Sequence, residues 1–353
     1  MPSRWQRDPD AAADRLIGGL LPRLDLAGRV LIVSDSPEAL RAALAARGIA
    51  TALWARRVSR ERLLDAAAPV APLAAPWPPA GPFDAALVRL PKAKGEQEMA
   101  IAAALSVLAQ RGRVIVYGGN DEGIRSAARL IAAACGATTT IAAQAHGRVL
   151  AGLRPLQLTS LRTTLAAWRQ VTSARIGAHM RPWVSYPGIF AAGGIDEGTA
   201  LLAAHLPVLA PGKRVLDFAC GSGAIAASAL AQNGAIVLEV LDNDAVALAA
   251  CAENVPTARR ILGRGLADAP GRYDVILSNP PLHRGIASDH ALLDELVSKA
   301  PSHLNALGTL ALVVPRHVPL AGPLSRHFAE HAILAETPRY RVWRAQRLRQ
   351  AAG

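Results

Sequence analysis

The sequence predicts two α/β domains in series, each built on a mostly parallel, twisted sheet. The chain has 353 residues, which is the length of two domains of ordinary size rather than one. Hydrophobic residues make up 51% of it, enough for two packed cores. Short apolar runs alternate with helix-length stretches in both halves, and that alternation is typical of parallel strands joined by right-handed crossovers.

In the first half, apolar runs predict four strands with helices between them. The strands are expected at residues 29–34, 50–55, 83–90 and 113–118, and the helices at 37–47, between the last two strands, and at 122–135. A proline-rich connection covers 69–82, and Gly118-Gly119-Asn120-Asp121 predicts a turn.

The second half repeats this plan more clearly. Strands are expected at residues 214–217, 236–241, 273–278 and 308–314, and helices at 223–232, 245–254 and 288–304. Glycine and proline interrupt the pattern between about 150 and 185. The predicted domains are therefore 1–165 and 180–353.

The charge of the chain favours an anionic partner. Lys and Arg number 39 against 27 Asp and Glu, a net charge of +12. Residues 1–172 hold 22 basic and 13 acidic residues (+9), and residues 173–353 hold 17 and 14 (+3). Such a surplus is typical of nucleic-acid binding, although a general preference for arginine explains it equally well.

Composition also bounds the class of protein. The amino terminus has no apolar signal region, and no apolar run approaches the roughly 18 residues of a membrane span. Cys135, Cys220 and Cys251 are isolated, which excludes a disulfide framework and a cysteine zinc site. We expect a cytoplasmic protein with no membrane segment and no metal.

A glycine-rich loop joins the strand at 214–217 to the next helix. Gly221, Gly223 and Ala226 have the G-x-G-x-x-G/A spacing of dinucleotide binders. Asp242 follows Gly223 by 19 positions, about where a ribose-binding acid belongs. A nicotinamide enzyme, an S-adenosylmethionine enzyme and a tight turn without a ligand all explain this spacing.

Asp217 distinguishes between these alternatives. An anionic carboxylate at the mouth of the loop repels a pyrophosphate but attracts the ammonium and sulfonium groups of S-adenosylmethionine. We therefore assign Asp217 to the methionine end of that cofactor, directly or through water, and Asp242 to the ribose hydroxyls. Asp244 is interpreted as a helix N-cap.

A second motif, Ser278-Asn279-Pro280-Pro281, ends a predicted buried strand. Each proline fixes its own φ and forces the preceding residue to be extended, so the turn is rigid. In an open α/β sheet, such a turn beside the cofactor strand faces the ligand crevice. The amide oxygen of Asn279 and the carbonyl of Pro280 could accept both hydrogens of an exocyclic amine and aim its lone pair. A strand terminator without chemistry is the alternative.

With these two motifs the chain resembles the ribosomal RNA small subunit methyltransferase C family, two-domain rRNA guanine-N2 methyltransferases. Residues 186–190 and 194–199 are similar to the segment that lies over the cofactor in that family, and the likeness extends from about residue 80 onwards. It implies two tandem Rossmann-like class I methyltransferase domains, the first degenerate and without a cofactor site. Ser34-Asp35-Ser36-Pro37-Glu38, after the first strand, agrees because it contains no glycine.

The resemblance assigns roles to individual residues. The catalytic residues are Asn279, Pro280, Pro281 and Leu282, and the cofactor-binding residues are Asp217, Ala219, Gly221, Gly223 and Asp242. Two positions depart from the family pattern: Leu282 stands where an aromatic residue usually stacks on the flipped base, and Ala219 where glycine is common. Stacking on an aromatic contributes about 1–3 kcal/mol per base, most of which leucine loses.

The first domain is expected to hold RNA through phosphate contacts while the second does the chemistry. Candidate RNA contacts are Lys92, Lys94, His283 and Arg284. A solvated loop explains the lysines equally well, and a structural histidine is the simpler interpretation of His283.

The function predicted from the sequence is S-adenosylmethionine-dependent methylation of a guanine N2 amine in 16S rRNA. The expected substrate is ribosomal RNA or the small ribosomal subunit, and the expected state is a monomer. Alternatives are methylation of a large-subunit guanine or another amine, a NAD-dependent oxidoreductase, and a catalytically weak RNA-binding assembly factor.

Overall fold

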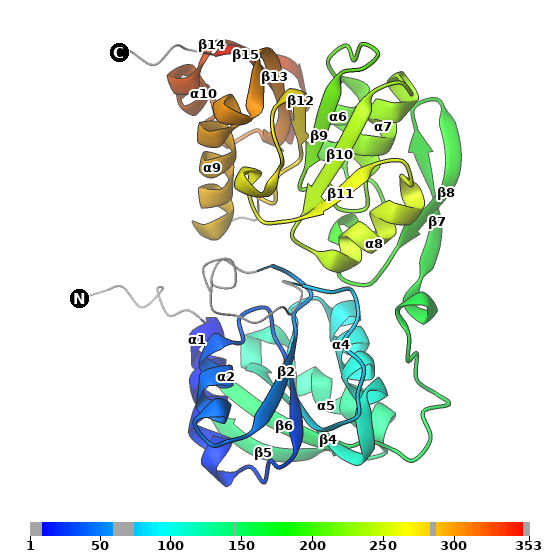
Figure 1. Ribbon diagram of the computed structural model, residues 1–353, viewed down its shortest axis with the longest axis vertical. Helices are drawn as coiled ribbons and strands as arrows, with labels where there is room; N and C mark the ends of the chain where they lie inside the picture. Colours follow the sequence, from blue (N-terminus) through cyan, green and yellow to red (C-terminus); the bar gives the residue numbers. More distant parts are fainter. Residues whose placement is uncertain (1–8, 59–73, 145, 283–286, 349–353) are drawn as a thin grey trace, which may run out of the picture. The chain divides into compact units, whose positions relative to one another are not determined.

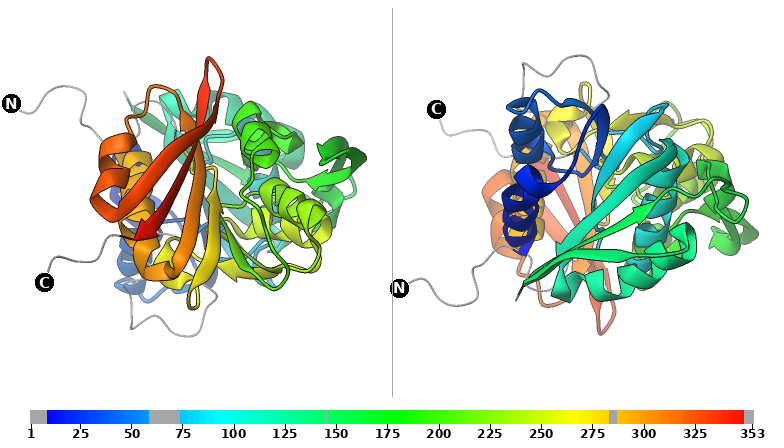
Figure 2. Two further views of the ribbon diagram at one scale, coloured as in Figure 1. Left: turned by 90° about the horizontal axis from the view of Figure 1, so that it is seen from above. Right: turned by 90° about the horizontal axis from the view of Figure 1, so that it is seen from below.

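The computed structural model of the chain describes residues 9–58, 74–144, 146–282 and 287–348 (Figure 1). The chain forms two compact units, residues 1–169 and 170–353. Each unit has its own sheet with helices on both faces, as the two end views of Figure 2 show. The two units are described separately below.

The first unit contains a six-stranded sheet in the order β2-β1-β3-β4-β6-β5. Its strands are β1 (Arg29–Val33), β2 (Ala50–Trp54), β3 (Phe83–Arg89), β4 (Leu108–Gly119), β5 (Thr139–Gln144) and β6 (Gly147–Leu153). Strands β1 to β4 are parallel, and β6 runs antiparallel to both β4 and β5.

Among the described residues of this unit, two helices cover each face of the sheet (Figure 1). They are α1 (Pro9–Leu20) and α2 (Glu38–Ala45) on one face, and α4 (Lys94–Ser106) and α5 (Ile124–Cys135) on the other. Because both faces are covered, the central strands are apolar throughout: Val30, Leu31, Ile32 and Val33 of β1 are all buried.

The second unit contains a seven-stranded sheet in the order β11-β10-β9-β12-β13-β15-β14. Its strands are β9 (Arg214–Phe218), β10 (Val237–Asp242), β11 (Arg259–Leu262), β12 (Tyr273–Ser278), β13 (Leu304–Pro315), β14 (Phe328–Glu336) and β15 (Tyr340–Leu348). All pairs are parallel except those made by β15, which runs antiparallel to β13 and β14.

Helices α6, α7 and α8 cover one face of the second sheet, and α9 and α10 cover the other (Figure 1). Their bounds are α6 (Glu197–Ala204), α7 (Ala224–Gln232), α8 (Ala245–Asn254), α9 (Ala287–His303) and α10 (Ala321–His327). A separate hairpin, β7 (Gln170–Ile176) and β8 (His179–Ser185), packs on the α7 and α8 side. Short 3-10 helices are η1 (Leu21–Arg23), η2 (Asn120–Glu122), η3 (Leu165–Trp168), η4 (Phe190–Gly193) and η5 (Leu266–Asp268).

The order of strands in the second unit defines where a ligand crevice forms. From β9 the chain crosses to β10 and β11 on one side, and then returns to β12 on the other side of β9. Loops that follow β9 and β12 therefore diverge from a topological switch point, which is where open α/β sheets bind ligands. Without its edge strand β11, the second sheet has the order β10-β9-β12-β13-β15-β14. This order corresponds strand by strand to the order β2-β1-β3-β4-β6-β5 of the first sheet, so the two units share one topology.

The predicted parallel strands and their connecting helices are present, whereas strands β5 to β8, β11 and β14 were not predicted. Strands β5 and β7 are largely exposed and lack a continuous apolar run for a sequence pattern to detect, whereas the buried run Val149–Ala151 of β6 offered such a signal and was missed. Strand β13 begins at Leu304, four residues before its predicted start, and α9 accordingly ends at His303. Across the described ranges, every helix is too short or too polar to span a membrane.

Candidate active site

Three strand ends meet at the carboxyl edge of the second sheet. The hydroxyl of Ser278, the last residue of β12, donates to the carbonyl of Phe218, the last residue of β9, at 2.9 Å. The amide of Cys220 donates to the carbonyl of Leu241 near the end of β10 at 3.1 Å. The glycine loop, Asp242 and the Asn-Pro-Pro turn therefore leave the sheet side by side.

The glycine loop contains three residues in the left-handed region: Ala219 (φ 58°), Gly221 (φ 54°) and Gly223 (φ 91°). At Gly221 an added Cβ would meet nothing within 4 Å, so a ligand can approach the backbone there. At Gly223 a Cβ would lie 2.7 Å from the sulfur of Cys251, so glycine is required for close packing on α8. Ala219 keeps the same left-handed backbone at a cost of about 1–2 kcal/mol, which explains why glycine is common at this position.

A second set of contacts, which was not predicted, holds this loop from the side of β8. The indole of Trp183 donates to the hydroxyl of Ser222 at 3.1 Å. Asn254, at the end of α8, donates to the Ser222 carbonyl at 3.0 Å and exchanges two hydrogen bonds with the backbone of Val184. These partners lie more than 30 positions from Ser222, so no local pattern could have identified them.

Asp217 lies in β9 beneath the loop, with no exposed surface. Its Oδ2 atom accepts from the Ala226 amide in the first turn of α7 at 2.9 Å. Within the described chain its Oδ1 atom is buried without a hydrogen-bond partner. Burial, reinforced by the charge of Asp242 and opposed by the Ala226 hydrogen bond, raises the pKa of Asp217 to about 8.

This position corrects the expectation of an anion at the mouth of the loop. The carboxyl group forms the floor of the crevice and is neutral at pH 7 without a ligand. Its partnerless Oδ1 atom is the kind of buried acceptor that a cation or a bridging water satisfies.

Asp242 ends β10 and remains partly exposed. Its Oδ2 atom accepts from the Gly221 amide at 2.8 Å, and its Oδ1 atom from the Asp244 amide at 2.9 Å. Each carboxylate oxygen has a second lone pair, so both can also accept from a diol. Asp244 caps α8 through the amides of Val246 and Ala247, as predicted.

Asn279 follows β12 with its side chain half-buried. Its amide nitrogen donates to Thr199 Oγ1 at 2.9 Å and to Asp196 Oδ1 at 3.2 Å, both in the first turn of α6 or at its cap. The amide oxygen is directed away from these two acceptors and receives no hydrogen bond from a described residue. Residues 194–199 had been singled out only as a segment over the cofactor, and their link to Asn279 was not predicted.

Pro280 is buried, and Pro281 and Leu282 are half-buried. The Leu282 side chain packs against the core between the sheet and α9, so it presents an apolar wall beside the turn. His283 and Arg284 lie outside the described residues, and their predicted contacts with RNA stay predictions.

In the first unit the corresponding sheet edge is closed by ion pairs. Asp35, after β1, accepts from the amides of Arg56 and Arg57 after β2, at 3.0 and 2.9 Å. The Arg57 guanidinium binds both oxygens of the buried Glu96 at 2.8 and 2.9 Å. The carboxylates of Asp35 and Glu96 are thus paired with backbone amides and a guanidinium at this edge, and no left-handed glycine loop follows β1. The first copy is degenerate, as predicted.

Lys92 and Lys94 are exposed at the connection from β3 to α4, at the same edge of the first sheet. The unit carries 22 basic and 13 acidic residues through Arg169, a net +9.

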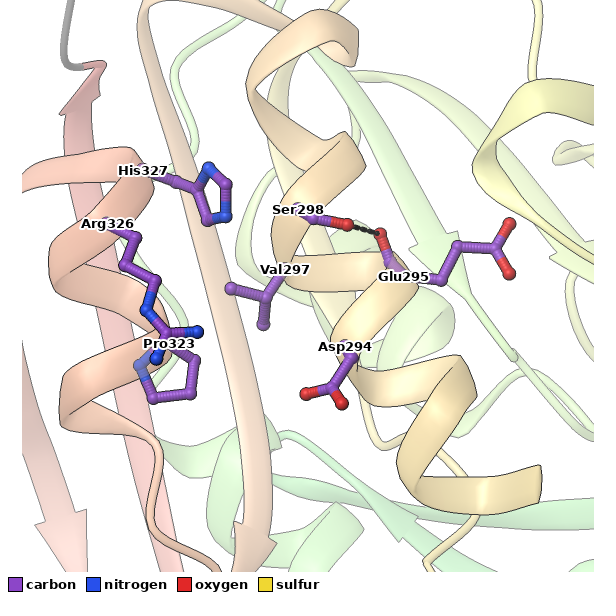
Figure 3. Close-up of a pocket in the computed structure, with 7 residues that line it drawn as sticks. All are labelled: Asp294, Glu295, Val297, Ser298, Pro323, Arg326 and His327. Carbon is purple, nitrogen blue, oxygen red and sulfur yellow. Dashed lines mark hydrogen bonds between the residues drawn. The ribbon is translucent and has the colours of Figure 1, made fainter. Parts of the chain in front are cut away.

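A hollow of about 320 Å³ lies elsewhere in the second unit, between α9 and α10 (Figure 3). Asp294, Glu295 and Ser298 line it from α9, and Arg326 and His327 from α10. No lining residue comes from the ends of β9, β10 or β12. The hollow is therefore separate from the candidate active site.

Sequence comparisons agree with this division. Residues 182–344 match the family described as the Methyltransferase small domain, and residues 23–154 match its N-terminal companion. Ribosomal RNA small subunit methyltransferase C of Shewanella oneidensis is 31% identical over 265 residues, 74% of this chain and 76% of that protein. The Alteromonas mediterranea protein of the same name is 32% identical over 263 residues, 73% and 72% of the two chains.

Among solved structures, a T. thermophilus 16S rRNA N2 methyltransferase in complex with AdoMet and guanosine superposes with a TM-score of 0.81. The likeness covers 98% of this chain and 94% of that one at 22% identity, which establishes the fold. The strand order and these comparisons together define a tandem class I methyltransferase. More particularly, the chain belongs to the ribosomal RNA small subunit methyltransferase C family, which confirms the predicted resemblance.

Proposed function

We propose that the protein transfers a methyl group from S-adenosylmethionine to the N2 amine of a guanine in 16S rRNA. The observation that carries the proposal is Asn279, whose amide nitrogen is held by Asp196 and Thr199 at the end of β12, next to the strand that leads into the glycine loop. The names of the relatives and the guanosine bound in the T. thermophilus enzyme support the same substrate.

The residues around the glycine loop fit S-adenosylmethionine. The buried Oδ1 atom of Asp217 lacks a partner, which suits the ammonium group of the methionine end, directly or through water. Asp242 is partly exposed and suits the ribose hydroxyls, and the open side of Gly221 admits the ligand. When bound, the cofactor supplies an electrophilic methyl group on its sulfonium.

The Asn-Pro-Pro turn addresses the weakness of an exocyclic amine as a nucleophile. The amine lone pair is delocalised into the base, and hydrogen bonds from its two hydrogens to the Asn279 oxygen and the Pro280 carbonyl localise it on nitrogen. Since Pro280 and Pro281 make the turn rigid, the two acceptors are positioned before the base arrives. The new bond from the amine nitrogen to the methyl carbon would form as the sulfur–methyl bond of the cofactor breaks, which leaves S-adenosylhomocysteine, and the surplus proton on nitrogen would pass to solvent.

A NAD-dependent oxidoreductase fits this site less well. Pyrophosphate binding uses free amides at the start of the helix that follows the glycine loop. Here the Ala226 amide already donates to Asp217, so it is not free for a phosphate, and a buried carboxyl group lies beneath the loop. The same alternative gives the Asn-Pro-Pro turn no role.

We assign the first unit to RNA binding because it carries most of the positive charge and its own sheet edge is closed. Lys92 and Lys94 are proposed phosphate contacts.

One chain contains every residue of the proposed site, so we propose a monomer as the catalytic unit. An rRNA substrate favours a cytoplasmic site of action.

The closed edge of the first unit leads to a test of stoichiometry. We expect one S-adenosylhomocysteine per chain in calorimetry, because the second unit has an open glycine loop after its first strand, whereas the described residues after β1 of the first unit form none. Two equivalent sites per chain would contradict the assignment of the first unit as cofactor-free.

Replacing Leu282 tests the departure from the family pattern. In Leu282→Phe, KM for RNA is expected either to stay the same or to decrease by up to about tenfold. The reason is that the aromatic ring restores stacking on the target base, a contribution of about 1–3 kcal/mol. Steady-state kinetics on rRNA measure this change, with S-adenosylhomocysteine affinity as the control. A large loss of kcat/KM in Leu282→Phe would show that the pocket does not accept a stacked base.

The substrate is tested by transfer of labelled methyl from S-adenosylmethionine to naked 16S rRNA, naked 23S rRNA and each ribosomal subunit. The proposal expects label in 16S rRNA, free or in the small subunit. Label confined to 23S rRNA would favour the large-subunit alternative. Turnover too slow to measure on any RNA, with RNA binding retained, would favour an assembly factor.

A further inference from the structure

The side-chain amide of Asn279 is held by two acceptors from a distant part of the chain. Asp196 and Thr199 lie 83 and 80 positions earlier, and both accept from the Asn279 nitrogen. An amide can be turned by half a rotation with almost no change in shape, but its donor and acceptor then exchange places. Whatever fixes that orientation decides whether Asn279 offers oxygen or N–H to a substrate.

The carboxylate of Asp196 selects the orientation of the Asn279 amide. An ionised carboxylate accepts hydrogen bonds and cannot donate, so only the NH₂ side of Asn279 can face it. The oxygen of Asn279 is consequently turned the other way. The Thr199 hydroxyl can either donate or accept, so it strengthens either orientation without selecting one.

We propose that Asp196 and Thr199 are positioning residues for Asn279: Asp196 sets the polarity of the amide and Thr199 holds it in place, so that the Asn279 oxygen accepts a hydrogen from the target amine. The inference rests on the proposed function, which it deepens by naming residues that act through Asn279. Neither side chain is assigned a contact with the base or the cofactor.

The position of Asp196 is itself well determined. Its carboxylate caps α6 by accepting from the amides of Gly198 at 3.1 Å and Thr199 at 3.2 Å. The helix start is packed closely, because a Cβ on Gly198 would lie 3.1 Å from the Tyr340 ring. Thr199 is 9% exposed, so water competes little for its hydroxyl. The acceptors therefore form a fixed support for the turn.

Asp196→Asn separates polarity from folding. Asparagine caps helices about as well as aspartate, so α6 is expected to remain folded. When the new amide caps α6 with its oxygen on the Gly198 amide, its NH₂ takes the place of the atom that accepts from both Thr199 and Asn279, and Asn279 no longer has to turn its oxygen outward. We expect kcat to fall about 10- to 100-fold, with the melting temperature kept and the dissociation constant for S-adenosylhomocysteine within about twofold.

Glu197→Gln is the matched control. It makes the same change of carboxylate to amide one residue away, where the side chain contacts Thr337 and Arg339 on the surface. Exposed pairs of this kind contribute little, so kcat is expected to stay within about twofold of the parent. Thr199→Val should reduce kcat several-fold, and Thr199→Ser should restore it.

A compensating pair gives the sharpest test. Asn279→Asp alone places two carboxylates face to face, and we expect it to be strongly impaired. Combined with Asp196→Asn, the new amide donates to Asp at 279, whose other oxygen faces outward as an acceptor. The double variant is expected to exceed both single variants in kcat by about tenfold.

Two results overturn the inference: an Asp196→Asn protein with unchanged kcat, or a double variant no faster than the better single variant. Failure of the proposed function is distinct, because in that case the unmodified protein forms no N2-methylguanosine at all.

Discussion

Asn279→Ala is expected to lower kcat for methyl transfer by at least about 10²- to 10³-fold, the range for loss of one preorganised transition-state hydrogen bond. The substitution removes the acceptor that localises the amine lone pair. Binding of S-adenosylhomocysteine should change little, because the hydrogen bonds of Asn279 are to Asp196 and Thr199 rather than to the glycine loop. Single-turnover transfer to rRNA and calorimetry measure the two quantities separately.

A matched control lies at the opposite edge of the same sheet. Asn305, at the start of β13, donates to Asp274 at 3.1 Å and lies far along the strands from the turn. Asn305→Ala should therefore leave kcat near that of the parent. Asn279→Ala protein that keeps half of the parent turnover would remove the catalytic role of the turn.

Cofactor affinity is expected to rise with pH, because ligand binding ionises a buried acid. The pKa of Asp217 is about 8 in the ligand-free fold, so its carboxyl group is protonated at pH 7. The ammonium group of the ligand favours the ionised form and releases that proton on binding. Between pH 6 and 8 the association constant for S-adenosylhomocysteine should increase by up to about tenfold per pH unit, and then level off.

Asp217→Asn is the control for ionisation of the ligand itself. At pH 8 the variant should bind S-adenosylhomocysteine more weakly than the parent does. The difference between their association constants should become smaller towards pH 6. Calorimetry in buffers of different ionisation enthalpy should detect proton release by the parent and less by the variant. Identical pH profiles for the two proteins would contradict the role of Asp217.

The same raised pKa also affects folding stability. Asp217 contributes to the free energy of unfolding of the ligand-free protein through its raised pKa. This contribution is fully present below pH 3.8, the pKa of the group in the unfolded chain, and is lost as the pH rises through about 8, its pKa in the folded protein. Thermal unfolding across that window should show a smaller loss of stability in Asp217→Asn than in the parent.

The sequence predicted the composition of the site because the carboxyl ends of parallel strands share one edge of a sheet. Gly221, Asp242 and Asn279 follow three such strands, so their convergence required only the correct strand assignment. The protonation of Asp217 could not be predicted, since it depends on complete burial under the loop. Proximity along the chain carries no information about that burial.

The supports of the site were missed for a related reason. Asp196 and Asn254 reach their partners across 83 and 32 positions, and such contacts exist only after tertiary packing. The family resemblance implied a degenerate first unit, and the absence of glycine after β1 agrees with it. The ion pairs that close its edge, such as that of Arg57 with Glu96, were not.

The central claim is tested most directly by nucleoside analysis of 16S rRNA after reaction with labelled S-adenosylmethionine. Digestion and mass spectrometry should recover the label as N2-methylguanosine with the parent protein, and at least about 100-fold less of it with Asn279→Ala at matched reaction times. Label in another nucleoside, such as a methylated adenosine, or equal N2-methylguanosine from both proteins, would contradict the account.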